Sequence, residues 1–111
     1  MKLVIAIIHP EQLPAVKQAL FDAEVRRFAA TTVQGTIPKA EQQTYRGVEH
    51  EVSLFNRIRL EIAVNEAFLQ PTIDAIIEGA RATDGAGKIF VLDLGDCIRI
   101  RTGESGSTAI G

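Results

Sequence analysis

Hydrophobic and polar positions change their period along the 111-residue chain, and each change predicts a regular element. Residues 3–8 form an unbroken aliphatic run closed by His9-Pro10, which is typical of a strand buried on both faces. From 11 to 23, apolar positions recur at three- and four-residue steps, so an amphipathic helix is expected there. The Val, Thr and Phe residues of 25–34 favour a second strand.

The second half of the chain repeats this succession of elements. Apolar and charged residues alternate up to Val64, which predicts a strand with one face on the core. Residues 66–81 have helical apolar spacing, with Asn65 in the N-cap position. A glycine-rich turn then leads into a strand over 89–94. The small, polar residues 102–111 predict a flexible tail.

The order strand, helix, strand, strand, helix, strand predicts an α+β, ferredoxin-like βαββαβ fold. In this fold an antiparallel four-stranded sheet carries two helices on one face. Arg57, Arg59 and Glu61 cannot cover the other face of the sheet, so apolar surface is expected there. Self-association is the simplest way to cover it.

Residues 35–51 break every period and predict a long loop, with Gly35, Pro38 and Gly47 among them. A loop of this length in a small domain is uncommon and usually functional. Tyr45, Arg46 and Gly47 lie in its middle, where an aromatic and an arginine are good anchors for a partner protein. The alternative is that they are solvated turn residues.

Length and composition narrow the classes of protein. The chain has room for a single domain, 1–111, and its 46% hydrophobic and 23% charged residues favour a folded one. A net charge of −2, one Tyr and no Trp argue against nucleic acid as a partner. No apolar run is long enough to insert into a bilayer, so a cytoplasmic location is expected.

The candidates for metal binding and catalysis are few. Cys97 is the single cysteine and is expected to be a buried, inert thiol, and His9 and His50 are far apart, so no metal site is predicted. His9 follows a strand and precedes a helix, where it either contacts an anion or is a plain surface histidine. No nucleophile and base stand together, so no catalytic residue is assigned and an enzyme is not expected.

An anion site is the strongest chemical signal in the chain. Gly85-Ala86-Gly87-Lys88 lets backbone N–H groups converge, and Arg99 and Arg101 follow downstream. The alternation Ile98-Arg99-Ile100-Arg101 predicts that both guanidinium groups share one strand face. A polyphosphate is the expected ligand, and a helix-ending turn with solvated basic residues is the alternative. The motif is not a Walker A loop.

Four blocks of the chain resemble the P-II nitrogen-regulatory signal-transduction family in order and spacing. They are residues 1–10, Tyr45-Arg46-Gly47-Val48-Glu49-His50, the segment 85–91, and the segment 98–104. The resemblance covers nearly the whole chain, and its last two blocks are the specific ones.

The resemblance implies a homotrimer with ATP or ADP in clefts between subunits, and Mg²⁺ as a companion ion. Residues 35–52 would form the effector-binding T-loop, 82–88 the phosphate-binding B-loop, and 102–111 the C-terminal tail. It also implies that the nucleotide is bound by Gly35, Val64, Gly85, Ala86, Gly87, Lys88, Arg99 and Arg101. In this set Val64 would lie beside the adenine, and Arg99 and Arg101 would come from the neighbouring subunit.

Departures from the family pattern alter these expectations. His50 stands where relatives have the modified tyrosine, so no covalent modification is expected. Gly35-Thr36-Ile37-Pro38-Lys39 replaces a Gly-Phe-Gly and a nearby glutamine that hold Mg²⁺ and 2-oxoglutarate, and His9 replaces a basic residue. The resemblance therefore implies weakened or altered 2-oxoglutarate sensing, unless Gln42 or Gln43 substitutes for the glutamine.

The function implied is a non-enzymatic nucleotide sensor that regulates a partner through the T-loop, in nitrogen metabolism. The partner is a membrane transporter, an ammonium channel by default, or a metabolic enzyme, and Arg46 is the residue expected to insert into it. One alternative is a P-II-like sensor retuned to another small molecule or anion and another transporter. Two others are an acylphosphatase-like small hydrolase and a purely structural trimer.

Overall fold

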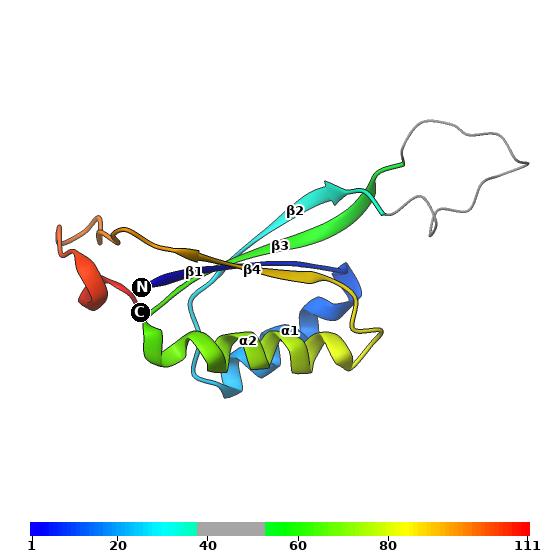
Figure 1. The fold of residues 1–111 in the computed structure, drawn as a ribbon, viewed down its shortest axis with the longest axis horizontal. Helices are drawn as coiled ribbons and strands as arrows, with labels where there is room; N and C mark the ends of the chain where they lie inside the picture. Colours follow the sequence, from blue (N-terminus) through cyan, green and yellow to red (C-terminus); the bar gives the residue numbers. More distant parts are fainter. Residues whose placement is uncertain (38–52) are drawn as a thin grey trace, which may run out of the picture.

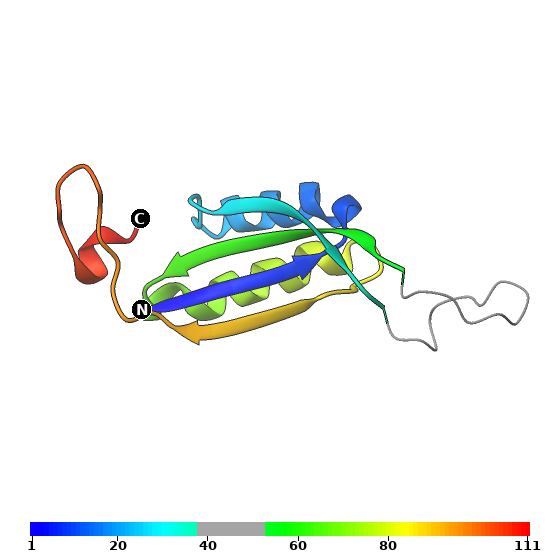
Figure 2. The same ribbon diagram turned by 90° about the horizontal axis from the view of Figure 1, so that it is seen from above.

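A computed structural model describes residues 1–37 and 53–111 and has the predicted α+β architecture. Four antiparallel strands form one sheet in the order β2-β3-β1-β4 (Figure 1). Both α-helices lie on the same side of this sheet (Figures 1 and 2). The elements are β1 (Lys2–Ile8), η1 (Pro10–Gln12), α1 (Leu13–Asp22), β2 (Ala29–Gly35), β3 (Phe55–Val64), α2 (Glu66–Arg81), β4 (Lys88–Asp93) and η3 (Gly106–Ala109).

The core lies between the sheet and the two helices, and strand alternation decides which residues reach it. In β1 the even-numbered residues Val4, Ala6 and Ile8 are buried, and they lie beside buried residues of β3 such as Leu60. The helices contribute Val16, Leu20, Ala75 and Ile76 from the opposite side. Burying each large aliphatic side chain stabilises the fold by about 1.5–3 kcal/mol.

The other face of the sheet stays open in the single chain, as the sequence predicted. The odd-numbered residues Leu3 and Ile5 of β1 are partly exposed and pair with Leu92 and Phe90 of β4. Phe90 and Leu92 are 48% and 44% exposed. No described helix covers this face (Figure 1), so it offers an apolar surface to a partner.

Helix α2 occupies the predicted residues, with two local differences. Asn65 stands at the N-cap, but its side chain donates to the carbonyl of Ser107 at 3.0 Å and caps no helix N–H. Pro71 lies inside the helix, and the neighbouring Thr72 hydroxyl donates to the carbonyl of Phe68 at 2.7 Å.

Neither α1 nor α2, the two α-helices of the described residues, has the length and apolar character that crossing a bilayer requires.

The second strand begins later than the sequence predicted, at Ala29 instead of residue 25. Glu24 adopts a left-handed conformation with φ of 64°, which ends α1 and turns the chain. The N–H of Val25 then donates to the carbonyl of Leu20 at 2.9 Å, and Val25 is only 6% exposed. Residues 25–28 are therefore a packed connector, whose apolar residues face the core without belonging to a strand.

The prediction of a strand at Ile98–Arg101 with both arginines on one face is wrong. The N–H of Arg99 donates to the carbonyl of Glu104, and the N–H of Gly103 donates to the carbonyl of Arg99, both at 2.8 Å. These bonds close a tight turn, with Ile98 bridged to Ser105 and Ile100 fully exposed. The flexible tail is also corrected in part, because η3 forms within it and Ala109 is buried.

Candidate functional site

The B-loop joins α2 to β4 and passes close to the end of β1. Gly85 and Gly87 both have positive φ, 70° and 125°. A Cβ atom at Gly87 would lie 2.5 Å from the carbonyl oxygen of Ile7, a distance at which backbone would have to shift. Gly87 therefore needs to be glycine for both conformation and space.

Gln12 ties the B-loop to the beginning of α1. Its side chain is fully buried, and its Nε2 donates to Asp84 Oδ1 and to the carbonyl of Ala86, both at 2.9 Å. Its Oε1 accepts the N–H of His9 at 2.7 Å. Because a buried amide is costly when its bonds are unmade, this network holds the loop against the β1–α1 junction.

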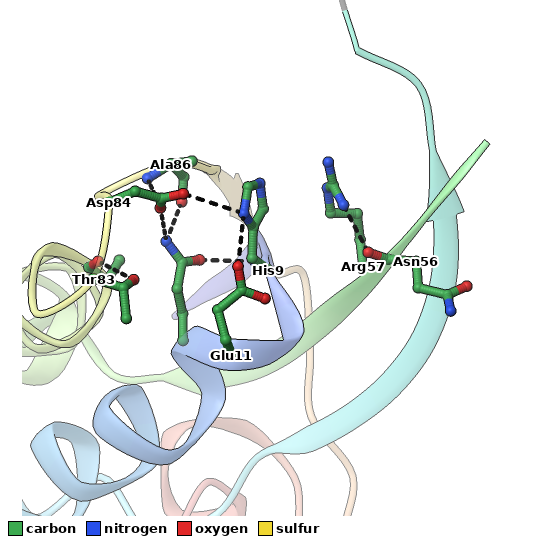
Figure 3. Close-up of polar contacts among 9 residues, drawn as sticks. His9, Glu11, Asn56, Arg57, Thr83, Asp84 and Ala86 are labelled. Atoms are coloured by element: carbon green, nitrogen blue, oxygen red, sulfur yellow. Dashed lines mark hydrogen bonds and ion pairs between the residues drawn. The ribbon is translucent and has the colours of Figure 1, made fainter. Parts of the chain in front are cut away.

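Asp84 is the acidic centre of the loop. Its Oδ1 accepts the N–H of Ala86 at 2.9 Å, and this bond is the main cause of a pKa below the usual range for that carboxyl. Its Oδ2 lies 3.5 Å from His9 Nδ1, and Glu11 Oε1 lies 3.4 Å from the same nitrogen. Figure 3 shows the side chains of Glu11 and Asp84 pointing toward His9 from different segments.

A pocket of about 400 Å³ opens beside the B-loop, between α2 and β4. Its walls include the apolar residues Ile73 and Ile77 of α2 and the loop residues Ala86 and Gly87. Two cationic residues, Arg81 and Lys88, also line it. Within residues 1–37 and 53–111, Lys88 makes no ion pair. The N–H groups of Gly85 and Ala86 donate within the protein, to the carbonyl of Ala80 at 3.0 Å and to Asp84 Oδ1 at 2.9 Å. The ammonium group of Lys88 is therefore the part of this wall that best suits phosphate oxygens.

The structure separates the predicted nucleotide-binding residues into two groups. Gly35 ends β2 opposite Phe55, at the end of the sheet where β1 finishes with Ile8. Lys88 pairs with Ile7 at this same end. Val64 pairs with Lys2 at the opposite end of β1, about 17 Å away along the strand at 3.3 Å per residue.

The two arginines lie in the C-terminal segment, which is at the same end of the sheet as Val64 (Figure 1). Arg99 donates to the carbonyls of Ala109 at 3.4 Å and Gly111 at 3.2 Å, and its Nε lies 3.7 Å from Glu104. Arg101 is exposed and forms no ion pair with any described residue. One chain therefore does not bring Arg101 to its own B-loop.

Other residues singled out in the sequence have simpler outcomes. Tyr45, Arg46, Gly47 and His50 lie outside the described residues. Cys97 is partly exposed, which corrects the prediction of a buried thiol.

Sequence reasoning missed Gln12, Glu11 and Asp84. Gln12 carried a usable signal, because it stands four residues before Val16 and so lies on the buried face of the helix. The approach of Glu11 to Asp84 had no signal in the sequence, since 73 positions separate them.

The sheet, the two helices and the glycine loop define an α+β protein of the ferredoxin-like type. Residues 1–104 match the family described as Nitrogen regulatory protein P-II. The chain belongs to this family, whose proteins act in nitrogen regulation and signal transduction.

Curated relatives extend over nearly the whole chain. It is 49% identical to the Nitrogen regulatory protein GlnK1 of Methanosarcina mazei, with 99% of this chain and 97% of the relative covered. It is 42% identical to the Nitrogen regulatory protein P-II 1 of Methanothermobacter thermautotrophicus, with the same shares covered. It is 38% identical to the Nitrogen regulatory protein P-II of Rhizobium etli, with 99% and 100% covered. These relatives are named as regulatory proteins, which leaves the hydrolase alternative without support.

Proposed function

We propose that this protein is a non-enzymatic sensor that binds ATP or ADP in clefts between the subunits of a homotrimer. The single observation that carries the proposal is the separation of the binding set into two groups at opposite ends of β1. The two groups of one chain lie about 17 Å apart along β1, whereas a ring of copies would bring the B-loop of one subunit beside the Arg101 end of the next.

The open face of the sheet supports the ring. Leu3, Ile5, Phe90 and Leu92 form an apolar surface that a single copy leaves in water. Burial of apolar area is the main driving force of association, and three copies meeting through these faces would enclose it. The same association would align the two halves of each cleft.

Each half of a cleft suits a different part of an adenine nucleotide. Gly87 and Lys88 provide backbone N–H groups and a cation for phosphate oxygens. Arg101 would add a forked donor from the neighbouring subunit. Val64, at the end of β3, is only 4% exposed in the single chain, so it would meet the adenine with its exposed edge. Mg²⁺ would accompany the phosphates of ATP.

Sensing of 2-oxoglutarate would be weak or altered in this protein. His9 stands where relatives use a basic residue, and here its ring nitrogen faces the carboxylates of Glu11 and Asp84 at 3.4 and 3.5 Å. A dicarboxylate approaching His9 would meet two like charges, which disfavours its binding. This observation favours, as the second candidate, a P-II-like sensor retuned to another small molecule or anion.

The output would pass through residues 35–52 to a partner protein. Membership of a nitrogen-regulatory family supports a partner in nitrogen metabolism, either a membrane transporter such as an ammonium channel or a metabolic enzyme. Tyr45, Arg46 and Gly47 have the composition of an interface anchor, with Arg46 as the inserting residue. The protein would act in the cytoplasm.

Calorimetric titration with ATP, ADP and AMP, each with and without 2-oxoglutarate, tests the proposal. The wild-type protein should bind ATP or ADP with little effect of 2-oxoglutarate, and Lys88→Ala should lose most of this binding. Glu78→Ala, a charge change on helix α2 outside the proposed cleft, is the control and should bind as wild type. Wild-type protein that binds no adenine nucleotide would sink the proposal. Strong enhancement by 2-oxoglutarate would make the protein an ordinary nitrogen sensor.

A further inference from the structure

Three side chains that commonly bind metal ions converge where β1 ends. Nδ1 of His9 lies 3.4 Å from Oε1 of Glu11 and 3.5 Å from Oδ2 of Asp84. All three potential ligand atoms lie within 4.8 Å of one another. His9 and Glu11 come from the β1–α1 junction and Asp84 from the B-loop (Figure 3). None of the three belongs to the proposed nucleotide-binding set.

The spacing fits a shared metal ion better than a hydrogen-bonded ion pair. A charge-assisted bond between an imidazole and a carboxylate has a length of about 2.7–2.9 Å, and neither contact of His9 is that short. Two ligands at about 2.0–2.1 Å from a tetrahedral ion lie roughly 3.4 Å apart. The two contacts of His9 therefore have the spacing of neighbouring ligands, and the oxygens of Glu11 and Asp84 lie within 4.8 Å of each other.

The buried side chain of Gln12 holds the backbone of His9 and the carboxylate of Asp84 in position. Gln12 accepts the N–H of His9 through Oε1 at 2.7 Å and donates to Asp84 Oδ1 through Nε2 at 2.9 Å. The N–H of Ala86 donates to the same Oδ1 at 2.9 Å, so Oδ2 is left to face His9. Partners of this kind fix ligand orientation in metal sites and raise metal affinity.

We propose that His9, Glu11 and Asp84 form a binding site for a divalent transition-metal ion such as Zn²⁺. One nitrogen and two carboxylate oxygens suit this class of ion, whereas Ca²⁺ needs six to eight oxygen ligands. The side chains of His9, Glu11 and Asp84 are 23%, 62% and 56% exposed, so water can complete the coordination. The cation also offsets the two facing negative charges.

A bound ion would join the beginning of α1 to the B-loop. Asp84 already organises that loop through Ala86, so binding at its other oxygen would order the loop further. Binding of a metal ion would thus be a second way to order the B-loop, separate from nucleotide binding. It would not require a bound nucleotide.

Titration of metal-stripped protein with Zn²⁺, without nucleotide, tests the site, and Co²⁺ absorption in the visible range reports the coordination. The expected result is one ion per chain, with affinity at least tenfold weaker in Glu11→Gln and Asp84→Asn. Asp84→Asn keeps the Oδ1 acceptor for Gln12 and Ala86. Glu11→Gln changes a side chain that is 62% exposed and whose one ion pair among the described residues is with His9, so both variants should fold.

The matched control is His50→Gln, which removes the other histidine of the chain and should leave Zn²⁺ binding unchanged. Loss of binding in His50→Gln alone, or wild-type affinity in both Glu11→Gln and Asp84→Asn, would overturn the site. Lys88→Ala separates this proposal from the nucleotide proposal, because it should keep Zn²⁺ binding while it loses ATP and ADP. The two proposals can therefore fail independently.

Discussion

Gly79 of α2 lies directly against the backbone of Val16 in α1. A Cβ atom added at Gly79 would be 2.5 Å from the Val16 Cα and 2.6 Å from the Val16 nitrogen. Such distances are not tolerated between a Cβ and backbone atoms, so the missing side chain sets how closely the helices pack. This close packing helps to bury Val16, which has no exposed surface.

Gly79→Ala should therefore destabilise the protein by about 2–3 kcal/mol, because the helices must separate to admit one methyl group. Gly95→Ala is the control: a Cβ atom there meets nothing within 4 Å, and the change should stay within about 0.5 kcal/mol. Urea unfolding followed by circular dichroism measures both free energies of unfolding. Equal stability of the two variants would contradict the packing described here.

Gln12 supports a second prediction, on the stability of the junction between β1 and α1. Gln12→Met keeps the approximate size of the side chain but removes its bonds to His9, Asp84 and Ala86. The polar groups left behind are partly buried, so a loss of about 1–3 kcal/mol in the free energy of unfolding is expected. Gln18→Met removes an exposed bond to Asp22 and should cost at most about 0.5 kcal/mol. If the two substitutions cost the same, the buried network does not stabilise the fold.

The two glycines of the B-loop should respond differently to alanine. At Gly85, with φ of 70°, a substitution adds left-handed strain of about 1–2 kcal/mol, and at Gly87 the φ of 125° is one that residues with a Cβ adopt even less readily. Only Gly87→Ala also brings a Cβ atom within 2.5 Å of the Ile7 carbonyl, whereas the nearest atom to Gly85 is at 3.5 Å. Gly87→Ala should consequently unfold at lower urea concentration than Gly85→Ala. The reverse order would be inconsistent with this loop geometry.

The lowered pKa of Asp84 predicts an acid-dependent contribution to stability. The pKa is lower in the folded protein, mainly through the N–H of Ala86, than the value of about 3.9 for an unfolded aspartate. The folded state therefore favours the ionised carboxyl, and its stabilising effect is present above pH 4 and is lost as pH falls through the folded pKa. The stability difference between wild type and Asp84→Asn should shrink over that range.

This pH series is measured by urea unfolding with a metal chelator present. Asp93, whose pKa is also lowered through its bond with Lys2, is common to both proteins, so its contribution cancels in the difference. A difference that stays constant between pH 7 and pH 2 would mean that ionised Asp84 is not favoured by folding.

The fold could be predicted where apolar spacing and burial coincide. The helical spacing of the apolar positions in residues 66–81 predicts a helix, and α2 has those bounds. Residues 25–28 misled the prediction, since the positive φ of Glu24 turns the chain before the strand begins. The turn at Arg99–Gly103 depends on backbone hydrogen bonds that alternation of side chains does not record.

The candidate site was predictable only in part, for a related reason. Gly85, Gly87 and Lys88 lie within four consecutive residues, so the sequence alone indicates this part of the site. The approach of His9 and Glu11 to Asp84 depends on the antiparallel pairing of β1 with β4, which brings the B-loop to the end of β1. Such contacts follow from topology and could not be derived from local pattern.

Mixing two inactive variants tests most directly the central claim that each nucleotide site is built from two subunits. Lys88→Ala and Arg101→Ala homotrimers should each bind ATP poorly. Trimers assembled at random from equal amounts of both should regain intact sites in about a quarter of the clefts, because each mixed ring of three has one cleft with both residues. Recovery of about this fraction in a calorimetric titration is the predicted result, and no recovery in confirmed mixed trimers would contradict the shared site.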